Sequence, residues 1–144
     1  MKVITVFTLA FVCMSYSCVQ ESSSPLAGAW ELVEGKYISE DTMLTYPMTA
    51  SSEHMKILSE SHFATIWQDT TNPHPAYPGM NGGSYTLVDS LYTEHLDYAS
   101  NPSVIGTKAL CKVKFDGDRF ILSPVSEDGQ NQEYGFYEEW KRVD

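Results

Sequence analysis

Hydrophobic and polar residues alternate along almost every apolar segment of this sequence, the pattern of β-strands that bury one face. The alternating segments end at Gly, Pro, Asn or Asp residues. They predict strands at 28–38, 55–60, 61–68, 83–88, 91–98, 104–115, 119–123 and 133–143. Asp116-Gly117 separates two of these segments, and Asp-Gly is a strong hairpin signal. No segment has the period of a long helix, and residues 41–54 are expected to form a loop or a short helix.

These elements predict an all-β fold. Eight antiparallel strands of this length can form a sandwich or an up-and-down β-barrel. Short connections favour the barrel, because each strand then pairs with its chain neighbour and closure removes the exposed edges. An eight-stranded barrel either fills its interior with side chains or leaves room for one small ligand, and the pattern leaves both open. We therefore expect a single eight-stranded antiparallel up-and-down barrel.

The segment 82–98 carries polar residues on the side that is predicted to be buried. The residues in this phase are Tyr85, Leu87, Tyr92, Glu94, Leu96 and Tyr98. A carboxylate on a buried face has to be neutral, paired or hydrogen-bonded. Glu94 is therefore interpreted in three ways: as a polar anchor for a ligand hydroxyl or amine, as a general base, or as a group that tyrosine hydroxyls, Arg142 or lysines satisfy.

The first residues have the features of a secretory signal peptide. Lys2 precedes an apolar segment that is too short for a membrane-spanning helix, and small residues then lead to Cys18. Residues 1–17 are interpreted as the signal, Cys18 as a lipidated first residue and 18–26 as a flexible tether. This places the protein in the bacterial cell envelope, lipid-anchored at the outer membrane or in the periplasm. Ordinary cleavage after Ser17 is the alternative and would give a secreted protein.

Charge and cysteine content narrow the expected partners of the remaining barrel domain, residues 27–144. The chain carries a formal net charge of −10, which argues against nucleic acid and against electrostatic binding to anionic lipid. Membrane contact is therefore expected only through the N-terminal lipid. Cys111 is then left without a partner and is predicted to be a small buried hydrophobe. A Cys18–Cys111 disulfide is open only if Cys18 is not lipidated.

Both ends of the predicted barrel carry recognisable residues. Gly28-Ala29-Trp30 opens the first strand, and Trp140 and Arg142 close the last. This arrangement resembles the lipocalin and fatty-acid-binding superfamily, which implies that Trp30 packs across the closed end of the barrel under a basic side chain. A guanidinium can stack over an indole face, so Trp30 and Arg142 are assigned to structure.

The segments MKILSESHFATIW, GGSYTLVDSLYTEHLDY and EEWKRV extend this likeness. They resemble the small bacterial lipocalin-like lipoproteins of the calycin superfamily, a family mostly of unknown function. The resemblance implies a barrel tethered in the cell envelope and no established substrate. The chain departs from larger lipocalins because it lacks their disulfide pair and their long C-terminal helix.

The predicted function is non-covalent binding of a small, hydrophobic or amphipathic molecule inside the barrel. Phenols suit such a ligand because each offers a flat apolar face and one polar tip. The residues predicted to line the site are Trp67, Tyr85, Leu87, Tyr92, Glu94, Tyr98 and Tyr137. No metal, cofactor or catalytic residue is predicted, because the four histidines show no paired spacing and no nucleophile motif is present.

Two other functions fit the same residues. An envelope enzyme would use Glu94 as acid or base with a tyrosine as its partner. A protein-interaction module would present the long loop 69–83, which contains three prolines, to an envelope partner. An interior already filled by aromatic side chains would favour the interaction module.

Overall fold

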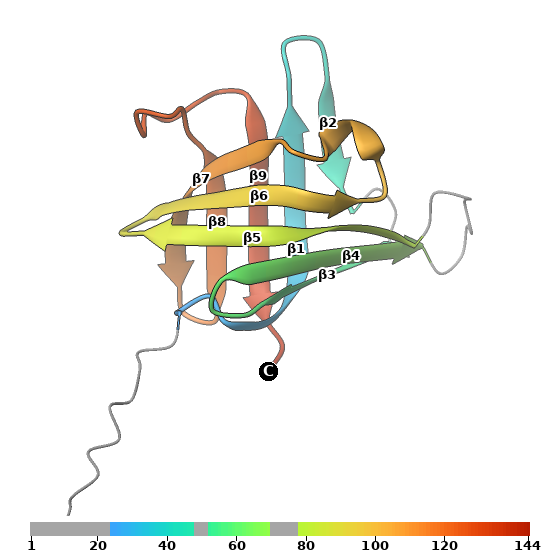
Figure 1. Cartoon of the computed structure of the whole chain (residues 1–144), viewed down its shortest axis with the longest axis vertical. Coiled ribbons are helices and arrows are strands. Elements are labelled where there is room, and N and C mark those ends of the chain that lie inside the picture. Colours follow the sequence, from blue (N-terminus) through green and yellow to red (C-terminus); the bar gives the residue numbers. More distant parts are fainter. Residues whose placement is uncertain (1–23, 48–51, 70–77) are drawn as a thin grey trace, which may run out of the picture.

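The computed structural model describes residues 24–47, 52–69 and 78–144. They form one antiparallel sheet that closes on itself (Figure 1). Its strands are β1 (Gly28–Ile38), β2 (Met43–Tyr46), β3 (Ser52–Leu58), β4 (His62–Asp69), β5 (Gly79–Val88), β6 (Leu91–Ala99), β7 (Lys108–Asp116), β8 (Arg119–Pro124) and β9 (Gly135–Arg142). A short 3₁₀ helix, η1 (Pro102–Val104), follows β6. No helix in these ranges is both long enough and apolar enough to cross a membrane.

The strands confirm the predicted eight-stranded barrel and add one strand to it. From β3 to β9 each strand pairs with its chain neighbour, and β1 closes the barrel by pairing with β3 on one side and β9 on the other. The second half of β1 pairs instead with β2, which therefore continues the line of β3. The predicted loop or short helix at 41–54 is wrong here. Met43–Tyr46 form the strand β2. Because most of these residues are exposed, the segment does not show the alternation of apolar and polar residues by which the other strands were predicted.

Other strand boundaries also differ from the sequence prediction. Residues 79–83 belong to β5 and not to the loop 69–83, because the glycines among them have no side chain and allow close contacts. A Cβ on Gly79 would lie 2.2 Å from the Trp67 indole, and one on Gly83 would lie 1.9 Å from a backbone oxygen. Residues 70–77 lie outside the described residues. The strand predicted from residue 104 begins only at Lys108, after η1.

The hairpin predicted at Asp116-Gly117 is confirmed, with β7 paired to β8 and Gly117 at φ +61°. Only glycine adopts this left-handed conformation without a steric penalty, and it lets the chain reverse between the two strands.

One end of the barrel is sealed by apolar packing around Trp30. Its ring meets Phe120 edge to face at 4.6 Å, and its Nε1 donates to the Leu26 carbonyl at 2.9 Å. The Arg142 guanidinium lies 4.1 Å from the Trp30 ring centroid, which confirms the predicted stacking. Leu26 is fully buried, so the end of the segment predicted as a tether belongs to the folded domain. Residues 1–23, with the predicted signal and Cys18, lie outside the described residues.

Candidate functional site

The barrel interior beyond this closed end contains a cavity of about 230 Å³. Inward-facing residues of β2 to β9 line it, because alternate side chains of each strand point to the same face. The lining residues are Tyr46, His54, Lys56, Thr65, Trp67, Asn81, Tyr92, Glu94, Leu96, Ala109, Cys111, Leu122, Phe136, Glu138 and Trp140. The cavity wall is thus largely apolar and aromatic, with one lysine and two glutamates on it.

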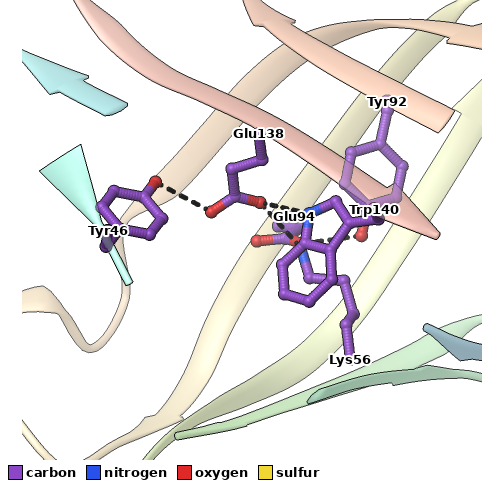
Figure 2. A network of polar contacts seen from close by, with 6 residues as sticks. All are labelled: Tyr46, Lys56, Tyr92, Glu94, Glu138 and Trp140. Atoms are coloured by element: carbon purple, nitrogen blue, oxygen red, sulfur yellow. Dashed lines mark hydrogen bonds and ion pairs between the residues drawn. The ribbon is translucent and has the colours of Figure 1, made fainter. Parts of the chain in front are cut away.

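Lys56 is at the centre of a polar network on this wall (Figure 2). Its Nζ lies 2.7 Å from Glu94 Oε1 and 3.4 Å from Glu138 Oε2, and its side chain is only 3 % exposed. The ammonium also lies 5.0 Å from the Trp140 ring centroid and slightly farther from the rings of Phe63 and Tyr92. A buried lysine therefore has both opposite charges and aromatic faces around it, which compensates for lost hydration.

Neutral donors hold the two carboxylates in place. Tyr92 Oη donates to Glu94 Oε1 at 2.7 Å. Tyr46 Oη donates to Glu138 Oε1 at 3.0 Å, and Trp140 Nε1 donates to Glu138 Oε2 at 2.8 Å (Figure 2). The donors come from β2, β6 and β9, so the network connects strands that are far apart in sequence.

Burial and charge set the protonation states in this network. Burial alone lowers the pKa of Lys56, but the nearby Glu94 and Glu138 carboxylates outweigh it, so the pKa lies above its ordinary value. Burial raises the pKa of Tyr92 well above its ordinary value, and Glu94 adds to the effect. Burial and Glu138 likewise raise the pKa of Tyr46. At neutral pH the lysine is therefore charged and both phenols are neutral donors.

One wall of the cavity is a stack of flat rings. His54 lies between Tyr46 and Trp67, with ring centroids 5.8 and 6.2 Å apart and interplanar angles of 15° and 26°. Burial lowers the pKa of His54, which favours the neutral imidazole. The stack offers a planar apolar surface close to the Glu138 hydrogen bonds.

The predicted site residues fall into two groups. Trp67, Tyr92 and Glu94 line the cavity. Tyr85 faces inward but lies in the core near the closed end, where its hydroxyl donates to the Ser59 carbonyl at 2.6 Å. Leu87 packs against the same core. Tyr85 and Leu87 are therefore core residues, and the prediction that they line the cavity is wrong.

Tyr98 and Tyr137 do not face the cavity. Tyr98 is 69 % exposed, because a β-bulge intervenes: Gly82 pairs with Tyr98 and Gly83 pairs with Leu96, which leaves Asp97 as the extra residue. The bulge reverses the alternation, so the prediction for Tyr98 is wrong. Tyr137 lies between the inward-facing Phe136 and Glu138, and its hydroxyl donates to the Gln132 carbonyl outside the cavity. The prediction for Tyr137 is wrong because its side chain alternates with those of Phe136 and Glu138 and so points to the other face of β9.

Comparison with known families gives one match. Residues 25–144 match the model of a domain of unknown function, DUF4488. The chain belongs to the DUF4488 family. No curated protein and no solved structure matches it. The family description assigns no activity, so the chemistry of the DUF4488 domain has to be inferred from its own residues.

Sequence reasoning missed several polar and aromatic residues of the DUF4488 cavity, among them Tyr46, His54, Lys56 and Glu138. Lys56 shares its phase with Leu58, and this phase was visible in the segment HMKIL. The exposed Met55 and Ile57 flank Lys56 and gave the opposite, misleading indication of the buried face. Tyr46 lies in the strand that had no pattern at all. Glu138 is in phase with Trp140, which could have revealed it.

Of the alternatives for Glu94, the structure confirms pairing by a tyrosine hydroxyl and a lysine. Arg142 does not take part, since it lies at the closed end. Cys111 is buried and has a free thiol on the cavity wall. Within the described ranges, no group of three or more His, Cys, Asp or Glu residues is arranged to hold a metal ion.

Proposed function

We propose that this protein is an exported, lipid-anchored barrel that non-covalently binds a small, partly apolar molecule in the cavity. One observation carries the proposal: apolar and aromatic walls enclose a cavity in which a few polar groups are fixed in position. Ligand sites commonly combine mostly apolar walls with a small number of positioned polar groups. Lys56 and its partners provide this fixed polar set without filling the space.

The cavity volume limits the ligand. At about 230 Å³ the cavity is below the roughly 300–1,000 Å³ typical of sites for drug-sized molecules. The ligand is therefore a compact molecule with a planar or short apolar part, and a long acyl chain would extend out of the barrel. An interior filled by aromatic side chains would have favoured a protein-interaction module. The cavity shows that the interior is not filled, so this argument for the interaction module does not apply.

The position of Ser24 supports a tether at the closed end. Its Oγ forms a hydrogen bond with Tyr85 Oη at 2.9 Å, and its N donates to Glu60 Oε2 at 2.7 Å, so the first described residue is fixed beside β5 and the β3–β4 turn. β2 pairs with the opposite end of β1 (Figure 1). Tyr46 of β2 lines the cavity. A lipid on Cys18 would then attach the closed end to the membrane and leave the cavity end away from it. Membership of the calycin superfamily, as a lipocalin-like protein, is part of this proposal.

Native mass spectrometry of the full chain, purified from its native host, tests the proposal. The expected result is a reproducible added mass that is released on denaturation. Glu94→Ala should lose this mass, whereas Tyr98→Ala, an exposed outer-face change, should keep it. A bare mass for the wild-type chain, with no shift after incubation with pools of small apolar and amphipathic molecules, would overturn the proposal.

The same experiment addresses the rival enzyme. The Tyr92–Glu94 hydrogen bond provides the carboxylate–tyrosine pair that acid–base chemistry would use. In that case the released molecule would differ in mass from the one supplied. Glu94→Gln would then stop the conversion and still retain the bound substrate. Release of the supplied molecule unchanged supports the binder.

A further inference from the structure

The charged residues of the cavity wall do not balance. Lys56 is its one lysine, whereas Glu94 and Glu138 are both acidic. His54 adds no charge at neutral pH, because burial lowers its pKa. The Cys111 thiol is also neutral, because burial raises its pKa to about 12. The wall therefore carries one negative charge that no cationic side chain on it matches.

The unmatched charge has a free acceptor atom. Glu94 Oε1 accepts from both Lys56 Nζ and Tyr92 Oη, whereas Glu94 Oε2 accepts no hydrogen bond from any residue in the described ranges. Both oxygens of Glu138 already accept from Tyr46, Lys56 or Trp140. The Glu94 side chain lines the cavity and is 13 % exposed. No fully buried side-chain oxygen in the described ranges lacks a hydrogen-bond partner, so the unpartnered Oε2 is accessible to solvent.

The aromatic walls favour the same sign of charge. A cation gains energy over the face of an aromatic ring, whereas an anion does not. Tyr46, Trp67, Tyr92 and Trp140 all line the cavity, and Lys56 already uses the Trp140 face. A ligand anion would instead meet two carboxylates and a lysine whose partners are already in place.

We propose that the ligand of this cavity carries a protonated amine that pairs with Glu94 Oε2, with its planar apolar part against the His54–Trp67 wall. This inference rests on the proposed binding function and names the class of molecule bound. Lys56 acts as a positioning residue here: it holds Glu94 Oε1, which leaves Oε2 for the ligand.

Three probes of nearly the same shape test the sign of the charge: phenethylamine, 2-phenylethanol and 3-phenylpropionate. Isothermal titration calorimetry of the full chain at pH 7 compares them as cation, neutral molecule and anion. A hydrogen bond between charged groups contributes about 1.5–3 kcal/mol, so the amine should bind about tenfold or more tightly than the alcohol. The acid should bind weakest.

Glu94→Gln is the matched variant, because its amide oxygen can still accept from Lys56 and Tyr92. It should weaken binding of the amine much more than binding of the alcohol and so remove the preference for the amine, because the charge that attracts the amine is gone. Tyr98→Ala should retain the full preference. Chemical denaturation of Glu94→Gln verifies that the variant folds.

The outcomes separate this inference from the binding function. Equal or tighter binding of the alcohol or the acid overturns the amine inference and supports a binding cavity. If none of the probes binds, the molecule released from the native-host protein decides: an amine supports the inference, and a molecule without a basic nitrogen overturns it. A bare native mass together with no probe binding overturns the binding function itself.

Discussion

Two cationic side chains lie over indole rings in this barrel, and the two are satisfied in different ways. Arg142 lies 4.1 Å from the Trp30 centroid at the closed end, donates to the carbonyls of Ala27 and Pro25, and keeps a side chain that is 32 % exposed. Lys56 lies 5.0 Å from the Trp140 centroid inside the barrel, where its hydrogen-bond partners are two carboxylates.

The difference separates structure from binding. Arg142 pairs with backbone carbonyls and with the exposed carboxylate of Asp144, so it joins residues 25–27 to the last strand without removing a charge pair from water. Lys56 and its two glutamates are removed from water, and such a group adds little stability compared with apolar side chains of the same volume. A core that only had to close the barrel would not need it. The buried charges therefore support a role in the cavity.

Replacing each cation by methionine should give the largest contrast. Lys56→Met leaves two carboxylates without their cation, and breaking a buried ion pair from one side costs about 3–5 kcal/mol of unfolding free energy. Arg142→Met removes two hydrogen bonds to backbone carbonyls, the exposed ion pair with Asp144 and one cation–π contact, all at a partly exposed site, so it should cost about 1–2 kcal/mol. Equilibrium urea denaturation of both variants measures the two losses.

The triple variant Lys56→Met, Glu94→Gln and Glu138→Gln is the control for this contrast. It removes the uncompensated charges and should recover much of the stability that Lys56→Met loses. If Lys56→Met costs no more than Arg142→Met, the two cations are equivalent and the distinction between the two ends fails.

Removing one hydroxyl at each end should give a smaller contrast. Tyr85 and Tyr92 have rings 5.3 Å apart, but Tyr92 donates to a carboxylate and Tyr85 to a backbone carbonyl. A hydrogen bond to a charged group contributes about 1.5–3 kcal/mol and one between neutral groups about 0.5–1.5 kcal/mol. Tyr92→Phe should therefore cost more stability than Tyr85→Phe in denaturation experiments.

The affinity for a ligand should distinguish Tyr92→Phe from Tyr85→Phe more clearly than stability does. Tyr92→Phe removes a donor that orients Glu94 and should weaken binding of phenethylamine several-fold in calorimetry. Tyr85→Phe should leave that affinity unchanged, because its hydroxyl lies at the closed end. Equal losses of affinity in the two variants would contradict the assignment of the binding site to the cavity around Lys56.

The sequence predicted the architecture well because strand alternation and turn residues are local signals. The closed end was also predictable, since Trp30 and Arg142 lie at recognisable places near the two ends of the domain. The phase of Tyr98 was not, because a bulge at Asp97 depends on the pairing of two strands and leaves no mark in either alone. Each register irregularity of this kind reverses the face of every later residue.

The charge network was harder to predict, for a related reason. Glu94 was identified because it follows Tyr92 in phase on the same strand. Its partner Lys56 comes from β3, and Glu138 comes from β9, so their meeting depends on closure of the barrel. Lysine on an inward face also contradicts the usual expectation that charged side chains are exposed. Pairing across the barrel overrides this expectation, and only the folded chain shows the pairing.

Raising the pH tests the residues around the cavity, and its expected effect on the free energy of unfolding is the smallest of these predictions. Burial, with the Glu138 and Glu94 carboxylates, raises the pKa of Cys111 from 9.0 to about 12. The folded thiol thus holds its proton more tightly than the unfolded one. This contribution to stability is complete below pH 9 and is lost as the pH rises from 9 through 12, where the folded thiol also ionises.

At pH 10 the loss from this one thiol is about 1.4 kcal/mol, because the pH is then about one unit above the unfolded pKa. Cys111→Ala should lower stability at every pH through its smaller side chain, but its stability should fall less steeply between pH 8 and 10 than that of the wild type. Urea denaturation at pH 7, 8, 9 and 10 gives the two slopes. Parallel slopes would mean that the thiol is not buried beside the two carboxylates, and the alkaline sensitivity would then not come from the cavity.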